Sequence, residues 1–206
     1  MKPANEEIKR KLLKKNKAVA WFVSHCDTPS RREELAKDLN EELRKYNLKV
    51  DFYGQCYNPS CEGECGKTEG DKCFAIIESD YYFYLSFENS MCEDYVTEKI
   101  LIATKHYAVP IINGGADYNR FLPPGSYLDV NSLGHGALAA IINDTIANKE
   151  KYYDYFKWHN HYSIHASNES ADSDEICAFC AFLNDEKHSY TRSVYTHLSV
   201  FWKYYY

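Results

Sequence analysis

The stretch FYLSFENSMCEDYVTEKI, residues 83–100, decides the fold of this chain. Apolar and polar side chains alternate at its start, as expected for a strand over residues 82–87. A polar turn follows, and Thr97 then opens a helix that we expect over residues 97–108. A strand that runs through a turn into a helix is the unit of α/β proteins, which bind ligands at such turns.

Glu98 and Lys99 occupy the first turn of this expected helix. The backbone N–H groups and the positive end of the helix dipole favour an anion there, and Lys99 adds a formal positive charge. The pair therefore suits a phosphate that carries a sugar. The alternative on the motif alone is an ordinary surface Glu and Lys at a helix start.

The rest of the chain repeats this alternation of strand and helix. Further strands are expected at residues 17–24, 48–53, 109–112 and 126–130, and further helices from about Ser30 and over residues 74–79, 137–146 and 152–162. Leu35, Leu39 and Leu43 recur every four residues and give the first of these helices one buried stripe. The order predicts an α/β fold, a Rossmann-like parallel sheet with helices on both faces.

Composition limits the classes of partner. With 206 residues and 45% hydrophobic content, the chain is long enough to bury one substantial core. A formal net charge of −6 argues against nucleic acid as the main partner, because phosphate-backbone binding needs a basic surface. The 19 tyrosines offer aromatic faces that suit sugar rings, although half-buried packing accounts for most of them.

Cysteines and glycosylation sequons indicate an oxidising compartment. The chain has eight cysteines, at positions 26, 56, 61, 65, 73, 92, 177 and 180. Acceptor sequons begin at Asn143 and Asn168, so the lumen of the secretory pathway explains both signals. No apolar run reaches the roughly 18 residues that a membrane span needs. Membrane attachment is therefore expected only through an anchor that this chain lacks.

The cysteine-rich loop leaves two possibilities open. Cys56, Cys61, Cys65 and Cys73 are separated by four, three and seven residues, which departs from the paired spacing of zinc sites. Disulfides are favoured, and a zinc-stabilised interaction module is the alternative. We predict no metal at the reaction centre.

Three parts follow from these patterns. Residues 1–16 are a charged N-terminal segment, residues 17–165 are the α/β domain, and residues 166–206 are a C-terminal tail. The tail contains the motif Cys177-Ala178-Phe179-Cys180 behind an acidic stretch of small residues, which we expect to be a loop.

Two segments resemble the donor-binding half of the alpha-1,3-fucosyltransferases: FYLSFENSMCEDYVTEKI and AVPIINGGADYNRFLPPGSYLDV, residues 108–130. The resemblance starts at AVAWFVSHC, residues 18–26, and runs through YFKWHNHYSI, residues 155–164, to Cys180. It implies the donor half of a GT-B glycosyltransferase of the Golgi. The reaction it implies is transfer of L-fucose from GDP-fucose, with inversion, to the 3-hydroxyl of N-acetylglucosamine on a glycoprotein N-glycan. The resemblance implies no required cofactor, and the cysteine-rich loop resembles that of relatives that act on the N-glycan core.

The resemblance also implies roles for charged residues. Negative charge grows on the diphosphate as the glycosidic bond breaks, so cations and N–H donors held at the phosphates contribute most. Lys99 and Arg32 are the candidates for this role, with Arg31 as the competing choice for the arginine. Asn89 and Tyr95 can donate to phosphate oxygens from the turn.

Glu98 can only accept hydrogen bonds, so we predict that it holds the ribose hydroxyls, and we group it with Lys99 and Arg32 as catalytic. Val23, Ser24, His25 and Tyr84 are predicted to line the nucleotide pocket. Strand packing for Tyr84 and a strand-end turn for Ser24 are the structural alternatives. His25 stands where the family usually carries Asn, and an imidazole can replace the amide as a donor.

Glu88 is a possible general base next to Asn89. Strand alternation places it with Tyr84 and Ser86 on one face, and the resemblance assigns the base to the acceptor-binding half, which precedes AVAWFVS in the family. About 17 residues precede that point here. We therefore expect donor binding without transfer by these residues alone. The alternative to an enzyme is an inactive GDP-sugar-binding module.

Overall fold

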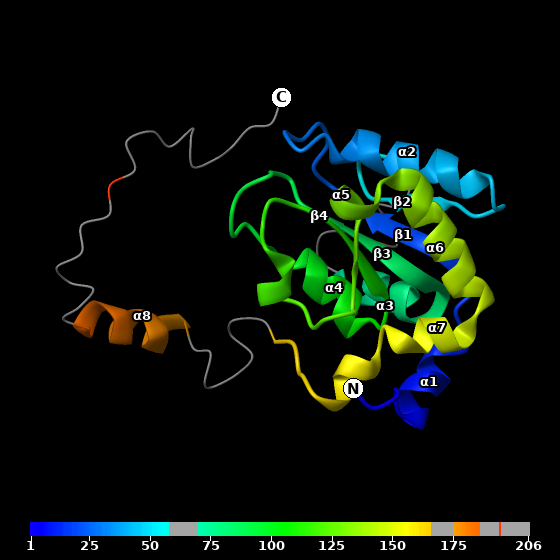
Figure 1. Cartoon of the computed structure of the whole chain (residues 1–206). Coiled ribbons are helices and arrows are strands. Elements are labelled where there is room, and N and C mark those ends of the chain that lie inside the picture. Colours follow the sequence, from blue (N-terminus) through cyan, green and yellow to red (C-terminus); the bar gives the residue numbers. More distant parts are fainter. Residues whose placement is uncertain (58–69, 166–174, 186–193, 195–206) are drawn as a thin grey trace.

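The computed structural model describes residues 1–57, 70–165, 175–185 and 194, and in these the chain alternates between strands and helices (Figure 1). The strands are β1 (Lys17–Phe22), β2 (Val50–Tyr53), β3 (Tyr81–Phe87), β4 (Val109–Asn113) and β5 (Leu128–Asp129). The α-helices are α1 (Glu6–Leu12), α2 (Arg32–Arg44), α3 (Gly70–Asp80), α4 (Lys99–Lys105), α5 (Val130–Leu133), α6 (His135–Ala147), α7 (Lys149–Asp154) and α8 (Glu175–Asn184). The 3-10 helices η2 (Tyr118–Arg120) and η3 (Lys157–Asn160) complete the described elements.

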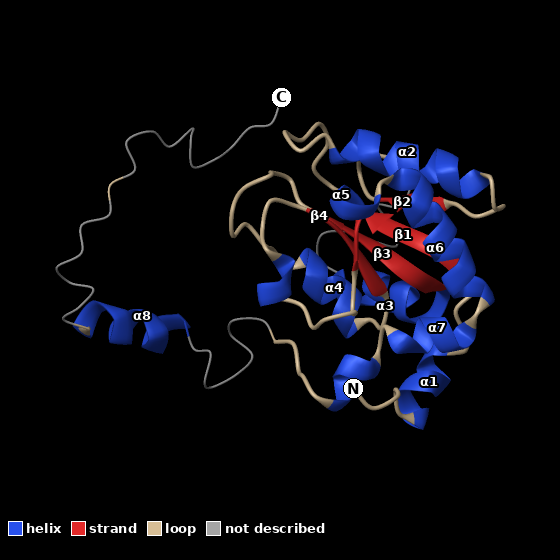
Figure 2. Ribbon diagram, in the orientation of Figure 1, coloured by secondary structure: helices blue, strands red, loops and turns tan. Residues whose placement is uncertain are grey.

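The described strands form one parallel sheet in the order β2-β1-β3-β4-β5. The chain moves from β1 to β2 on one side and then returns to place β3 on the other side of β1. This reversal between β1 and β3 is the topological switch point of the sheet. Figure 2 shows the sheet enclosed by helices, as predicted.

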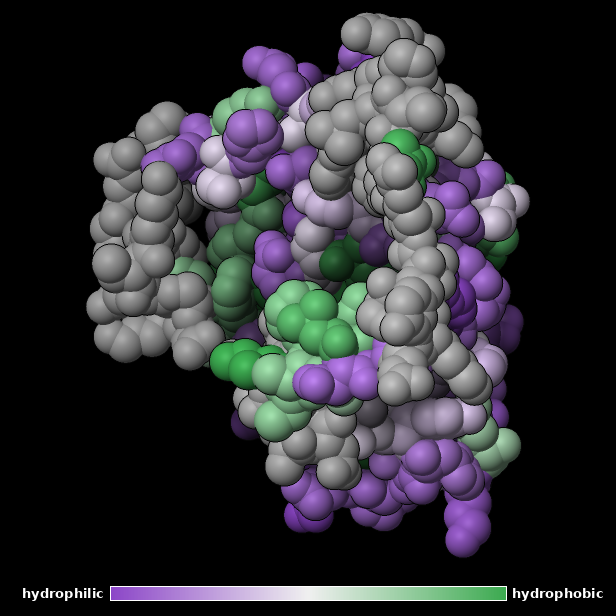
Figure 3. All heavy atoms as spheres, turned by 90° about the vertical axis from the view of Figure 1, so that its left-hand side faces the viewer, coloured by the Kyte–Doolittle hydropathy of each residue, from purple (hydrophilic) through white to green (hydrophobic). Residues whose placement is uncertain are grey.

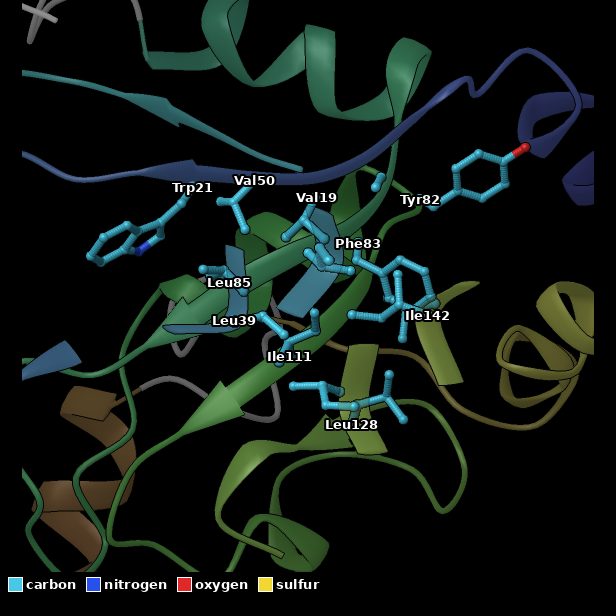
Figure 4. Close-up of a cluster of buried hydrophobic side chains, with 14 of the residues drawn as sticks. Val19, Trp21, Leu39, Val50, Tyr82, Phe83, Leu85, Ile111, Leu128 and Ile142 are labelled. Atoms are coloured by element: carbon cyan, nitrogen blue, oxygen red, sulfur yellow. The ribbon is translucent and has the colours of Figure 1, made fainter. Parts of the chain in front are cut away.

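Helices cover both faces of the sheet. On one face, Leu39 of α2 and Ile142 of α6 pack with Phe83, Leu85 and Ile111 (Figure 4). On the other face, residues of α3 and α4 pack against β1 and β3 in a second cluster that contains Ala20, Ile77, Tyr84 and Ala103. The prediction of a Rossmann-like parallel sheet covered on both faces is confirmed.

Strand β3 is buried along its whole length, including the polar positions of its alternating pattern. Tyr84 and Ser86 face α3 and α4 rather than solvent, and the Ser86 hydroxyl donates to the carbonyl of Lys99 over 3.0 Å. A central parallel strand has no solvent face, so its polar side chains must find partners inside the protein.

Several element boundaries differ from the sequence predictions. Helix α2 begins at Arg32 and not near Ser30, because Arg31 has a left-handed φ of 51°. Strand β5 has only two residues. The last aromatic segment is helical from Lys149 to Asp154 and then continues into η3. Its start is fixed by the Asn148 side chain, which caps the helix.

The N-terminal segment packs onto the domain. Ala4, Ile8 and Leu12 lie in the same core cluster as β1. Lys15 is 3% exposed, and its ammonium donates to the carbonyls of Ile77 over 2.9 Å and Tyr81 over 2.7 Å. Burial lowers the pKa of Lys15 to about 7. Residues 1–16 therefore share the core of the α/β domain.

Helix α8 projects away from the sheet in Figure 1, and Cys177 and Cys180 are exposed on it. The acidic loop predicted before it and most of the tail after it lie outside the described residues. None of the helices in the described part of the chain is both long and apolar enough to cross a membrane.

Candidate functional site

The predicted site residues gather at the carboxyl edge of the sheet, around the switch point. Residues 23–31 follow β1, residues 88–98 follow β3, and residues 114–127 follow β4, so their loops meet at one edge (Figure 1). Figure 3 looks onto the side toward which the strand ends point, where polar and apolar residues are mixed. Open parallel sheets bind their ligands at this place.

Lys99, Thr97 and Glu88 form a hydrogen-bonded cluster at the end of β3. The Lys99 ammonium donates to Glu88 Oε2 over 3.0 Å and to Thr97 Oγ1 over 2.7 Å. The Thr97 hydroxyl donates to Glu88 Oε2 over 2.8 Å, and the Thr97 backbone N–H donates to Glu88 Oε1 over 2.9 Å. The Lys99 side chain is 16% exposed, whereas that of Glu88 is fully buried.

Arg32 lies inside the polar network that joins β1 to β3. Its guanidinium donates to the carbonyls of Phe87 over 3.0 Å and His25 over 2.8 Å, and it pairs with Glu33 over 3.3 Å. It also lies over the ring of Trp21, 5.6 Å from the centroid. The side chain is 3% exposed, so it binds strand-end carbonyls, while the competing Arg31 is exposed and pairs with Glu34.

Two further links hold the loops together. The Ser30 hydroxyl donates to the carbonyl of Glu88 over 2.7 Å, and the Ser30 backbone N–H donates to the carbonyl of Asn89 over 3.2 Å. A disulfide joins Cys26, after β1, to Cys56, after β2. The loops that follow β1, β2 and β3 are therefore fixed to one another.

The remaining polar candidates lie around this cluster. Glu98 is 69% exposed and places Oε1 3.7 Å from the Lys99 ammonium. Tyr95 is half-buried, and burial raises the pKa of its hydroxyl. Asn89 is half-buried, and its side-chain oxygen has no hydrogen-bond partner among the described residues. Ser24 and His25 are exposed in the loop after β1.

Two residues expected in the nucleotide pocket, Val23 and Tyr84, are buried in this structure. Tyr84 is 1% exposed, because it lies in mid-strand on the face covered by α3 and α4. Val23 is 3% exposed, and its N–H donates to the carbonyl of Tyr53 over 2.9 Å. Gly54 has a φ of 96°, and a Cβ there would lie 2.3 Å from the Val23 carbonyl oxygen. The role predicted for both residues in nucleotide binding stays a prediction.

Sequence reasoning did not assign a role to the loop after β4. A Cβ on Gly115 would lie 2.8 Å from the backbone of Cys92, so glycine permits the loops after β3 and β4 to touch. The Tyr118 hydroxyl is buried without a hydrogen-bond partner among the described residues, and Glu88 contributes to raising its pKa, after burial. Arg120 forms an ion pair with Asp94 across the two loops. The two glycines in the run Asn113-Gly114-Gly115 were the sequence feature that could have indicated this close approach of the loops.

The structure tests part of the zinc alternative for the cysteine-rich loop. Cys56 is in the disulfide with Cys26, and Cys73 is also disulfide-bonded, so the zinc set that included them is wrong. Cys61 and Cys65 lie outside the described residues. In the described ranges, no group of three or more His, Cys, Asp or Glu side chains could hold a metal ion.

The fold and this edge define the molecule as a doubly wound α/β protein with its polar side chains gathered at the switch point. Residues 12–201 match the model of the family described as glycosyltransferase family 10 (fucosyltransferase), C-terminal region. The chain belongs to this family.

Two curated relatives are from Drosophila melanogaster. Alpha-(1,3)-fucosyltransferase C is 40% identical over 190 residues, which cover 91% of this chain and 41% of the relative. Glycoprotein 3-alpha-L-fucosyltransferase A is 36% identical over 195 residues, which cover 93% of this chain and 36% of the relative. The chain thus spans about two-fifths of the length of these relatives.

Solved structures of alpha1,3-fucosyltransferase share the fold. One matches with a TM-score of 0.61 and 22% identity, over 84% of this chain and 48% of the other. A second, a complex with GDP-fucose, matches with a TM-score of 0.59 and 20% identity, over 89% of this chain and 50% of the other. At this identity the likeness concerns the fold alone.

Proposed function

We propose that this chain is the GDP-fucose-binding half of an inverting alpha-1,3-fucosyltransferase, a GT-B enzyme, and that it binds the donor at the carboxyl edge of its sheet. One observation carries the proposal. The segment that includes Glu88, Thr97 and Lys99 forms an ordered cation-containing cluster at the switch point of a sheet shared with a fucosyltransferase that was solved with GDP-fucose.

Lys99 is the group we place against the diphosphate. An ammonium has three N–H donors, of which Glu88 and Thr97 take two. The third is left for a phosphate oxygen, where it stabilises the charge that develops as GDP leaves. Tyr95 and Asn89 add neutral donors from the same turn, and exposed Glu98 accepts from the ribose hydroxyls.

Arg32 acts from beneath the loops. A guanidinium has five N–H donors, and three of those of Arg32 are bound to His25, Phe87 and Glu33. The remaining two are offered to a phosphate that enters between the loops after β1 and β3. Ser24 and His25 lie at the entrance to this space and contact the nucleotide in this proposal.

Membership of the family supports our proposals for the acceptor, the compartment and the cofactor requirement. We propose a glycoprotein N-glycan as the acceptor, transfer to the 3-hydroxyl of its N-acetylglucosamine, and the Golgi lumen as the location. The Cys26–Cys56 disulfide supports an oxidising compartment. The donor GDP-fucose is the only small molecule required, and charge stabilisation at the phosphates comes from side chains.

Binding of a GDP-sugar without transfer is the second candidate. Its support is the state of Glu88, whose carboxylate is fully buried and cannot reach an acceptor hydroxyl. Transfer therefore needs a base supplied from the acceptor side. A transfer assay with an N-glycan acceptor separates the two candidates when an acceptor-binding half is supplied, because both candidates bind the donor and these residues alone are not expected to transfer.

Calorimetry with GDP tests the donor site. Replacing Lys99 with Ala should weaken binding by roughly 1.5–3 kcal/mol, the range for a hydrogen bond to a charged group. Lys105→Ala is the matched control, since Lys105 is an exposed lysine in the last turn of the same helix. Equal GDP affinity in wild type and the folded Lys99→Ala variant would remove Lys99 from the phosphate site.

Glu98→Gln tests the contact with the ribose. The amide keeps one acceptor oxygen but loses the charge, so GDP should bind more weakly. The loss should be smaller for 2′-deoxy-GDP, which lacks one of the hydroxyls that Glu98 holds. The same loss for both ligands in parallel titrations would contradict this role.

A further inference from the structure

Glu88 is held at the carboxyl edge through both its side chain and its backbone. Its side chain is fully buried, and both carboxylate oxygens accept hydrogen bonds, from Thr97 and from Lys99. Its backbone is held as well, because its N–H donates to the carbonyl of Asn113 over 2.8 Å and its carbonyl accepts from Ser30. Glu88 thus joins the loops after β1 and β3 to the end of β4.

A carboxylate in this place acts on Lys99. A lysine has a long, flexible side chain, and an ammonium left free at the edge would sample many rotamers. Glu88 and Thr97 form a closed triangle with the ammonium, with distances of 3.0, 2.7 and 2.8 Å, which holds it in one position. The N–H that the triangle leaves over then has a fixed direction before any ligand arrives.

We propose that Glu88 is a positioning residue for donor binding: its buried carboxylate fixes the Lys99 ammonium and the Thr97 turn so that they meet the diphosphate preorganised. This rests on the proposed donor site. Glu88 does not touch the donor, and its burial separates it from the acceptor. The entropy of ordering Lys99 is lost on folding and not on binding, and this preorganisation strengthens affinity.

Positioning and charge make opposite predictions. A carboxylate next to the site also repels a diphosphate, so removal of its charge alone would tighten GDP binding. Removal of a positioning residue weakens binding, and only while Lys99 is there to be positioned. Glu88→Gln, Lys99→Met and the double variant form the cycle that distinguishes these effects.

Calorimetric titration of GDP into these three variants and the wild type is the test. We expect Glu88→Gln to weaken binding about tenfold, and Lys99→Met by about tenfold or more. In the Lys99→Met background, Glu88→Gln should cause no further loss of affinity. Unchanged or tighter binding by Glu88→Gln, or an equal loss in both backgrounds, would overturn the proposal.

A second variant covers the case in which Glu88→Gln does not fold. Thr97→Val removes the hydroxyl that joins Glu88 to Lys99 and should weaken GDP binding about threefold or more. Thr104→Val is its control, because the Thr104 hydroxyl donates to carbonyls of its own helix, those of Ile100 and Leu101. Equal affinities for the two variants would contradict positioning through this cluster. Absence of GDP binding by the wild type would contradict the proposed donor site itself. Binding by the wild type with the variant results named above would contradict the role of Glu88 alone.

Discussion

His159 shows how burial changes the chemistry of a single residue. Its ring stacks on Trp158 at 3.7 Å and on Tyr107 at 5.4 Å between ring centroids. Burial, assisted by the charge of Lys11, lowers its pKa from 6.5 to about 4. The folded protein therefore holds a neutral imidazole at pH values where the unfolded chain binds a proton.

The lowered pKa of His159 makes the stability of the folded protein depend on pH. Because the pKa is lower in the folded state, protonation favours unfolding, and stability falls as the pH drops from about 6.5 to about 4. This site contributes at most about 1.4 kcal/mol per pH unit. The free energy of unfolding, measured with denaturant at several pH values in this range, should fall less steeply with decreasing pH in His159→Phe than in wild type. In the exposed His165→Phe it should fall as steeply as in wild type. The same pH dependence of the free energy of unfolding in His159→Phe and wild type would contradict this account.

At the same scale, the sequence indicated which residue types gather at the edge but not how they pair. Lys99 and Glu98 could be recognised because they are neighbours at a helix start. The partnership of Lys99 with Glu88, 11 residues away, depends on the loop between them, and no local periodicity describes that loop. The burial of Arg32 depends in the same way on carbonyls at two strand ends.

At the scale of elements, Lys15 fastens the end of α3 to the start of β3 through the carbonyls of Ile77 and Tyr81. Lys15→Met keeps an apolar stem but leaves both buried carbonyls without this donor, which should lower the free energy of unfolding by about 1–3 kcal/mol. Lys14→Met, at an exposed position, should change it little. Chemical denaturation measures both, and equal stabilities of the two variants would contradict the role of Lys15.

The disulfide fastens the loop after β1 to the loop after β2. Its two cysteines are 30 residues apart, so its loss should lower the free energy of unfolding by about 2–4 kcal/mol. The variant with Cys26→Ser and Cys56→Ser should also bind GDP more weakly, because Arg32 holds the carbonyl of neighbouring His25. Unfolding and GDP titration of this variant provide the test; full stability or full affinity would count against the respective part.

The central elements could be predicted because their signals are strong. Strands β1, β3 and β4 are nearly continuous apolar runs, and the Leu39 and Leu43 stripe predicted the buried side of α2. The limits of the edge strand β5 and the exact start of α2 could not be predicted. Their limits depend on pairing with β4 and on the left-handed backbone of Arg31, which are consequences of the assembled fold.

At the scale of the whole molecule, the strand order explains why one edge carries the site. The reversal between β1 and β3 places their carboxyl ends side by side, and the helices that follow the two strands, α2 and α4, cover opposite faces of the sheet. Local sequence patterns predict the strands but not their order, so the switch point required the structure. The opposite edge holds Lys15 and the start of β3 and has a structural role.

A map of backbone amide chemical shifts during titration with GDP-fucose tests the central claim most directly. The claim is that the donor binds at the carboxyl edge, in the loops that follow β1, β3 and β4. The account predicts saturable shifts concentrated in residues 23–31, 88–99 and 114–120, with few changes at residues 14–17 and 80–81 on the opposite edge. No saturable shifts, or shifts centred on the opposite edge, would contradict it.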